Sequence, residues 1–170
     1  MCGIAGIYSH KSVANELYES VIHLQHRGQD AAGIMTYDTR MHKHKGLGLA
    51  NEVFTEDNLQ LLLGNVGISH NRYPTHGGFS HGEIQPVWTS VPYGIAIAHN
   101  GQITNYDELV EEVTKKEKRY LNTTSDTEVL LHILANELDK NGVPNTSEEF
   151  FNHLCDAVGT IFNKVKGAYS

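Results

Sequence analysis

Cysteine is scarce in this sequence, which contains only Cys2 and Cys155. The N-terminus also lacks the basic segment and apolar core of a secretory signal. We therefore expect a cytoplasmic protein in which both thiols stay reduced. Cys155 lies among Phe151, Leu154 and Val158, a pattern that favours a small core residue over a reactive thiol.

Long apolar runs and excess basic charge are absent as well. No run approaches the roughly 18 residues of a membrane span, and the formal net charge is -7. Nucleic acid and anionic membranes are therefore not expected partners, because both require clustered Lys and Arg. Eleven histidines occur, with His42 and His44 on one side of a possible strand. Because no HExxH or paired Cys-x-x-Cys accompanies them, we expect no metal site.

What the sequence does contain is a series of strand-like and helix-like segments. Its 170 residues are long enough for one domain and short for two, so we expect one compact unit. Strands are predicted at 3–8, as a buried strand, and around 33–37, 66–70 and 94–99. Because strands come early and adjacent helices come late, the pattern favours an α+β fold over a parallel βαβ winding.

Four helices are predicted from their caps and apolar periods. Ser12 can cap the first, which should end near Gly28. The others begin with patterns that resemble capping boxes, at Asn105 and Glu108, Ser125 and Glu128, and Thr146 and Glu149. The last two helices should each lay an apolar stripe on the sheet. The final residues 167–170 look like the start of another strand, so we expect a domain that is incomplete at its C-terminal end.

Cys2 becomes the N-terminal residue if Met1 is removed, as is common before a small residue. Its thiol and a free α-amino group then share one residue, and the amine, which titrates near pH 8, can accept the thiol proton without a histidine partner. Taken alone, Met-Cys-Gly is a weak signal that favours an ordinary N-terminal strand over a nucleophile.

The segment His26 to Gly33 is a helix-to-strand loop dense in polar side chains and glycine. Arg27 and Gly28 could brace the cysteine, or the loop could be a tight turn held by an ion pair between Arg27 and Asp30. The residues alone leave these two interpretations open.

Three further positions have both a functional and an ordinary interpretation. Arg72 follows a predicted buried strand and needs an anion, which can be an internal carboxylate or a substrate carboxylate. Asn100 and Gly101 place a side-chain amide beside a glycine N–H, which can form an oxyanion hole or a plain hairpin turn. Asp126 can interact with the helix N-terminus or bind a substrate ammonium.

Together, these segments resemble the class II glutamine amidotransferase family. The motifs occur in the family's order and cover the chain from end to end: Met1-Cys2-Gly3-Ile4, HRGQDAAG at 26–33, RYPT at 72–75, AHNGQITNY at 98–106 and SDTEVLL at 125–131. HRGQDAAG and RYPT are most similar to the branch that starts purine synthesis by phosphoribosyl transfer. His76-Gly77 is more similar to the glucosamine-6-phosphate synthase branch.

The resemblance implies a role for each matching residue. The catalytic residues that it implies are Cys2 as nucleophile, with Asn100 and Gly101 as the oxyanion pair. Its substrate-binding residues are Arg72 for the carboxylate, Asp126 for the ammonium, and Thr75 and His76. Arg27 and Gly28 have supporting roles.

The resemblance also implies a fold and an activity. The fold is that of N-terminal-nucleophile hydrolases, two stacked antiparallel sheets between helical layers, and the activity is hydrolysis of L-glutamine to glutamate and ammonia. No cofactor is implied for this domain; a requirement for Mg in the purine-branch enzyme would belong to its phosphoribosyltransferase domain, which is absent here. Self-association through that absent domain stays open. The ammonia acceptor also stays open, because glucosamine-6-phosphate, glutamate and asparagine synthesis use the same chemistry. A catalytically silent fragment is a further alternative.

Overall fold

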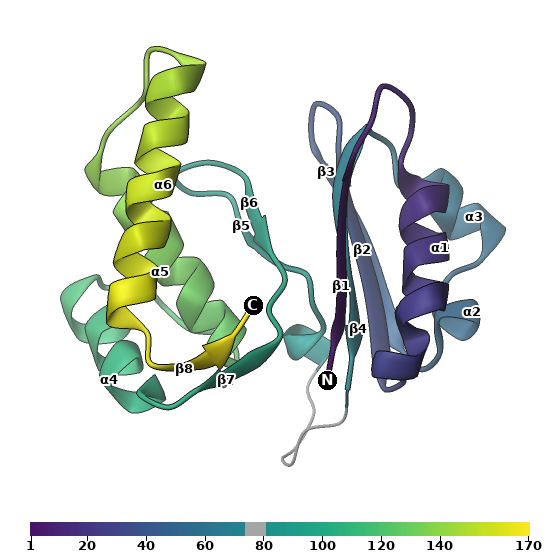
Figure 1. The fold of residues 1–170 in the computed structure, drawn as a ribbon, viewed down its shortest axis with the longest axis horizontal. Helices are drawn as coiled ribbons and strands as arrows, with labels where there is room; N and C mark the ends of the chain where they lie inside the picture. Colours follow the sequence, from purple (N-terminus) through teal and green to yellow (C-terminus); the bar gives the residue numbers. More distant parts are fainter. Residues whose placement is uncertain (74–80) are drawn as a thin grey trace. The chain divides into compact units, whose positions relative to one another are not determined.

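The computed structural model describes residues 1–73 and 81–170 and contains two compact units (Figure 1). The first comprises Met1–Val87 and Ala96–Asn100, and the second comprises Trp88–Ile95 and Gly101–Ser170. The single compact unit expected from chain length is therefore wrong. The reason is that the first sheet with its helices and the later helices each make their own set of packing contacts.

The first unit is built on a four-stranded antiparallel sheet. In chain order its strands are β1 (Gly3–Tyr8), β2 (Ala31–Tyr37), β3 (Met41–Leu47) and β4 (Val66–Arg72). The spatial order is β1-β4-β2-β3, and every neighbouring pair is antiparallel. β1 has the predicted bounds but is an edge strand, so the expected full burial is wrong, and Tyr8 is 73% exposed. Its first residue, Gly3, pairs with Asn71 near the end of β4, which brings Cys2 to the same end of the sheet as Arg72.

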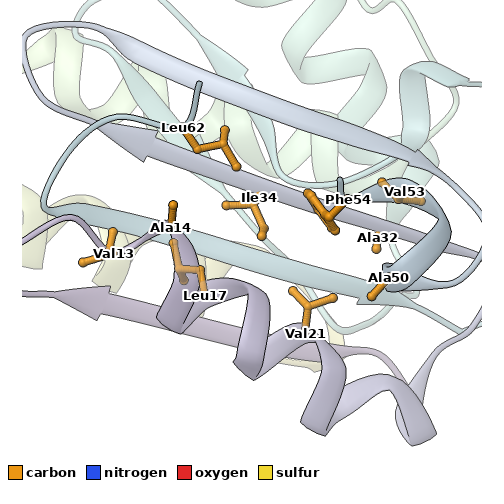
Figure 2. Packing of buried hydrophobic residues seen from close by; sticks show 10 residues of the cluster. All are labelled: Val13, Ala14, Leu17, Val21, Ala32, Ile34, Ala50, Val53, Phe54 and Leu62. Atoms are coloured by element: carbon orange, nitrogen blue, oxygen red, sulfur yellow. The ribbon is translucent and has the colours of Figure 1, made fainter. Parts of the chain in front are cut away.

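One face of this sheet is covered by α1 (Ala14–Leu24), which contacts β1, β2 and β4. A 3₁₀ turn at Gln25–Arg27 extends it, and two short helices follow β3, α2 (Ala50–Val53) and α3 (Glu56–Gln60). Figure 2 shows the core between them: Val13, Ala14, Leu17, Val21, Ala32, Ile34, Ala50, Val53, Phe54 and Leu62. Ser12 does not cap α1. Fully buried Val13 occupies the N-cap position instead, and its backbone N–H donates to the Gly64 carbonyl at 3.1 Å.

The chain then passes between the units. A 3₁₀ turn spans His81–Glu83, and β5 (Val87–Thr89) pairs with β6 (Ile95–Ile97). The second unit contains β7 (Gly101–Ile103), α4 (Tyr106–Glu111) with a π-helical turn at Glu112–Lys116, α5 (Asp126–Lys140), α6 (Ser147–Lys164) and β8 (Gly167–Tyr169). β8 pairs antiparallel with β7, which confirms the strand expected at 167–170. Within the described ranges, no helix is long and apolar enough to cross a membrane.

The three later helices begin where they were predicted, but their caps differ from capping boxes. Asn105 does not cap α4; its amide instead bonds the backbone of Lys164 and Lys166. Ser125 does cap α5. The carboxylate of Glu128, however, accepts hydrogen bonds of 2.7 to 2.9 Å from Asn122 and Thr123. Burial raises the pKa of Glu128, but these four bonds outweigh it, and the net shift is downward. Glu128 therefore anchors the preceding loop rather than its own helix end.

α6 is apolar on two adjacent faces, and only one of them is packed. Its main packing partner is α5, and α5 in turn contacts α6, α4 and the turn at Glu112–Lys116, so the expectation that these two helices lie on a sheet is wrong. Ala157 is the buried residue of α6. The neighbouring face carries Cys155 between Phe151, which is 62% exposed, and Val158, which is 52% exposed. Cys155 is itself exposed, so its expected core position is also wrong. Two of the apolar neighbours that suggested a core position, Phe151 and Val158, share this unburied face.

Candidate functional site

Cys2 lies at the head of β1, and residues distant in the sequence surround it. Its backbone N–H donates to Asn100 Oδ1 at 3.2 Å, across a separation of 98 residues. Because a backbone N–H can only donate, the oxygen of the Asn100 amide faces Cys2, and Nδ2 is its donor end. The Tyr73 N–H lies 3.5 Å from Cys2 Sγ. Cys2 is half-buried and Met1 is 72% exposed, so the residue before the cysteine is accessible.

Arg27 holds the other side of Cys2. Its Nε donates to the Cys2 carbonyl at 3.1 Å from the 3₁₀ turn that ends α1. Its Nη2 lies 4.0 Å from Met1 Sδ. An ion pair between Arg27 and Asp30 is not found among the described residues. Of the two interpretations that the sequence left open, the geometry favours bracing of the cysteine.

Gly28 follows this turn and lies against the end of β4. A Cβ at this position would be 2.4 Å from the Arg72 carbonyl carbon and 2.8 Å from the Tyr73 nitrogen. The Asp30 N–H donates to the Arg72 carbonyl at 3.1 Å, which holds the two segments together. Glycine at 28 therefore allows the turn that carries Arg27 to meet the strand that carries Arg72.

Arg72 ends β4, as predicted, and has an internal acid nearby. Its Nη1 lies 3.7 Å from Glu83 Oε2, and both side chains are mostly buried. At that separation the contact is an ion pair without a short hydrogen bond. The carboxylate partner that the sequence requires is therefore present inside the protein, and a substrate carboxylate at Arg72 would bind alongside or in place of Glu83.

His70 is a buried titratable group two residues before Arg72. It is 1% exposed. Burial lowers its pKa to about 4 from an ordinary value of 6.5, and nearby His99 and Arg72 add to the fall, while the His99 backbone offsets part of it. His70 is therefore neutral at neutral pH in the folded chain.

This shift predicts an acid-sensitive fold. His70 has its ordinary pKa of 6.5 in the unfolded chain and a pKa of about 4 in the folded chain. Between these two pH values the unfolded chain therefore binds a proton that the folded chain does not. The free energy of unfolding should therefore fall by roughly 3 kcal/mol as the pH drops through this window. In His70→Asn that part of the slope should disappear, while His10→Asn, at an exposed histidine, should keep it. Urea unfolding at half-unit pH steps measures this, and an unchanged slope in His70→Asn would refute the assignment.

Two predicted site residues belong to the second unit. Gly101 is the first residue of β7 and pairs with Tyr169 of β8. A Cβ there would lie 2.3 Å from the Ala168 carbonyl oxygen. The close approach of β8 is therefore a sufficient reason for glycine at this position. Asp126 is the first residue of α5, half-buried and 3.4 Å from Thr127 Oγ1. Thr75 and His76 lie outside the described residues, so their roles stay predictions.

Sequence reasoning missed two residues beside this site, Glu83 and Gln85. The Gln85 side-chain oxygen accepts a hydrogen bond of 2.6 Å from the backbone N–H of His99, the residue before Asn100. Neither residue is in a motif used for the prediction. The signal that was available is their position just before Pro86, in a loop between two predicted strands.

Two of the histidines, His42 and His44, have protein partners. His42 contacts Asp38 at 3.1 Å, and His44 contacts the Val53 carbonyl at 2.9 Å, both from β3. Across residues 1–73 and 81–170, three or more His, Cys, Asp or Glu side chains do not gather into a group able to hold a metal ion.

Comparison with known proteins decides the family. Residues 70–162 match the family described as Glutamine amidotransferase domain. The chain belongs to this family. Within it, the chain is a class II domain that corresponds to the N-terminal third of amidophosphoribosyltransferases.

Relatives of this amidotransferase domain come from bacteria, archaea and yeasts. The chain is 44% identical over 172 residues to amidophosphoribosyltransferase of Pseudomonas aeruginosa, with 100% of the chain and 34% of the relative covered. It is 49% identical over 172 residues to the Haemophilus influenzae protein of that name, with the same coverage. For the Methanocaldococcus jannaschii protein of that name, identity is 41% over 174 residues, with 100% and 35% covered. The chain thus spans about a third of the length of these relatives.

Two solved structures resemble the amidotransferase domain. One is described as the allosteric regulatory enzyme of purine biosynthesis, with a TM-score of 0.80 and 32% identity. The other is glutamine phosphoribosylpyrophosphate amidotransferase from B. subtilis in complex with ADP and GMP, with a TM-score of 0.77 and 32% identity. Each comparison covers 99% of this chain and 34% of the other. The expected α+β class agrees with this structural similarity. The expected antiparallel strand pairing is present in both units.

Proposed function

We propose that this domain hydrolyses L-glutamine to glutamate and ammonia, with Cys2 as an N-terminal nucleophile. The observation that carries the proposal is the contact of the Cys2 nitrogen with Asn100 Oδ1, at 3.2 Å. It brings the nucleophile of the family beside half of its oxyanion pair. Removal of Met1 would convert this nitrogen into an α-amine that keeps the same acceptor.

The proposed first half-reaction forms a thioester. The Cys2 thiol passes its proton to its own α-amine, and sulfur attacks the side-chain amide carbon of glutamine. The oxyanion that forms accepts hydrogen bonds from Asn100 Nδ2 and the Gly101 N–H. As the carbon–nitrogen bond breaks, the amine gives its proton to the leaving nitrogen, and ammonia departs.

The second half-reaction restores the enzyme. Water attacks the thioester carbonyl, the α-amine takes a proton from the water, and the same oxyanion pair stabilises the second tetrahedral intermediate. The carbon–sulfur bond breaks, glutamate leaves, and the thiolate regains its proton. Arg27 keeps the Cys2 carbonyl fixed through both steps, with its bond of 3.1 Å.

Recognition of free glutamine is assigned to its two charged ends. Arg72 would bind the α-carboxylate and Asp126 the α-ammonium, with Thr75 and His76 completing the pocket, as in the family. A peptide-bound glutamine lacks both charges and should be rejected. The proposed architecture is that of the family, two stacked sheets between helical layers.

The role of Arg72 predicts a change in KM. Arg72→Ala should raise the KM for glutamine about thirtyfold with a smaller change in kcat, because a lost contact between charges costs about 2 kcal/mol. Glu83→Gln removes the internal acid 3.7 Å away while keeping the guanidinium. Its KM should be unchanged or lower. Steady-state ammonia release measures both, and an equal rise in KM for Glu83→Gln would indicate that the pair only supports the fold.

The ammonia acceptor is proposed from the relatives. Their name, amidophosphoribosyltransferase, supports a parent enzyme that passes ammonia to phosphoribosyl pyrophosphate at the start of purine synthesis. Glucosamine-6-phosphate, glutamate or asparagine synthesis would use the same glutaminase chemistry with another acceptor domain.

A catalytically silent fragment is the second candidate, favoured by one observation. Arg72 already has Glu83 as an internal carboxylate partner, so its charge has a counter-ion without a substrate. Thermal melting with and without glutamine separates the candidates, because a competent site must stabilise the folded state on binding. A melting temperature that rises with glutamine concentration supports the glutaminase; no rise at any concentration supports the silent fragment.

A further inference from the structure

The loop that carries Gln85 is fixed to the sheet of the first unit. The carbonyls on either side of Gln85, those of Ile84 and Pro86, both accept hydrogen bonds from Lys45 Nζ on β3. Ile84 is fully buried and Pro86 is buried. Burial of the ammonium lowers the pKa of Lys45. A partly desolvated cation thus holds the backbone of this loop by two carbonyl oxygens.

Gly33 on β2 fixes the same loop from beneath. A Cβ at Gly33 would lie 2.1 Å from the Gln85 carbonyl oxygen, so the Gln85 backbone rests directly on the strand. Only glycine leaves room for this approach. Contacts with the sheet therefore fix the position of the Gln85 backbone.

The Gln85 side chain extends this rigidity to the site. Its Oε1 accepts from the His99 backbone N–H at 2.6 Å. Residues 98–100 lie outside any helix or strand, and His99 is 5% exposed, so this N–H is a buried donor that strand pairing does not satisfy. The next residue is Asn100, whose Oδ1 accepts from the Cys2 nitrogen. A continuous path thus runs from β2 and β3 through Gln85 to the Asn100 amide.

We propose that Gln85 is a positioning residue for glutamine hydrolysis, which holds the His99–Asn100 backbone so that the Asn100 amide faces Cys2; this inference rests on the proposed glutaminase function. Oxyanion stabilisation depends on a donor held about 3 Å from the developing charge. The loss of the Gln85 bond would release a segment without secondary structure and displace this donor. Displacements near 1 Å cost on the order of a hundredfold in rate.

Matched variants distinguish the effect of the hydrogen-bond acceptor of Gln85 from the effect of its side-chain volume. Gln85→Met keeps the length and removes the acceptor, and its kcat should fall at least about tenfold with KM for glutamine within about threefold, because Asn100 acts in the transition state. Gln85→Glu keeps an oxygen acceptor and should retain kcat within about threefold of wild type. The readouts are kcat and KM per folded chain, with folding checked by circular dichroism.

Two further measurements keep the test decisive. The rate of Cys2 alkylation by iodoacetamide should be the same in Gln85→Met and wild type, because the thiolate displaces iodide at a methylene carbon and no oxyanion forms. If Gln85→Met does not fold, Gln85→Asn replaces it, since its side chain is one methylene too short to hold the 2.6 Å bond, and the same loss of kcat is expected. Equal kcat for wild type and the acceptor-deficient variant would overturn the role of Gln85. Absence of ammonia release from the processed wild-type chain would instead overturn the proposed function.

Discussion

Cys2→Ala is expected to abolish ammonia release from glutamine while the fold is retained. The residue is half-buried at the head of an edge strand, and its backbone bonds to Asn100 and Arg27 do not involve the sulfur. Alanine therefore keeps the geometry and removes only the nucleophile. Without it, no thioester can form, and activity should fall by several orders of magnitude.

The second cysteine offers a matched control for this experiment. Cys155 is exposed on α6 and has no part in the proposed chemistry. Cys155→Ala should release ammonia at the wild-type rate, and both variants should melt within a few degrees of wild type. If Cys2→Ala released ammonia as fast as Cys155→Ala, the nucleophile would have to be another group.

Gly28→Ala is expected to damage both stability and activity. The added methyl would lie 2.4 Å from the Arg72 carbonyl carbon and 2.5 Å from its oxygen, and backbone atoms cannot rotate away as a side chain can. The end of β4 must shift, which should cost about 3 kcal/mol or more in the free energy of unfolding. The shift would also move Arg72 and the Tyr73 N–H that faces Cys2 Sγ, so kcat/KM should fall even in the chains that fold.

Gly6→Ala on β1 is the control for an added methyl in the same sheet. Its Cβ would meet Ile68 Cγ2 at 3.7 Å, an ordinary contact. Its unfolding free energy and its kcat/KM should stay close to the wild-type values. Denaturant unfolding and steady-state kinetics on both variants measure the difference, and equal behaviour of the two would contradict the close packing of Gly28 on β4.

The sequence was most informative where local pattern determines structure. The bounds of β1 follow from a short run of small, apolar and β-branched residues, and the starts of α4, α5 and α6 follow from polar residues before apolar runs. The hydrogen bonds at helix ends were less predictable, because the side chain of a cap residue can bond to its own helix or to a neighbouring loop. Glu128, for example, bonds the loop before α5 instead of the helix end.

Contacts between distant segments could not be predicted from the residues. Spacing alone gives no reason for Cys2 to meet Asn100, 98 residues away, or for Gln85 to bond His99. The second contact also depends on how β2 and β3 hold the backbone around Gln85. The resemblance to a family supplied the first pair as an expectation and left the second out. Cys155 shows the opposite failure: the apolar residues near it in the sequence predicted a core position, but it lies with Phe151 and Val158 on a face of α6 that is not buried.

The central claim is that Cys2, freed of Met1, is a nucleophile in a glutamine site. The most direct test is intact-mass spectrometry of the chain before and after treatment with a diazoketone analogue of glutamine, which alkylates a thiolate with loss of nitrogen. We predict a chain that lacks the initiator methionine and gains one adduct, mapped by peptide sequencing to Cys2 and suppressed by excess glutamine. Retention of Met1, or an adduct on Cys155 that glutamine does not suppress, would contradict the account.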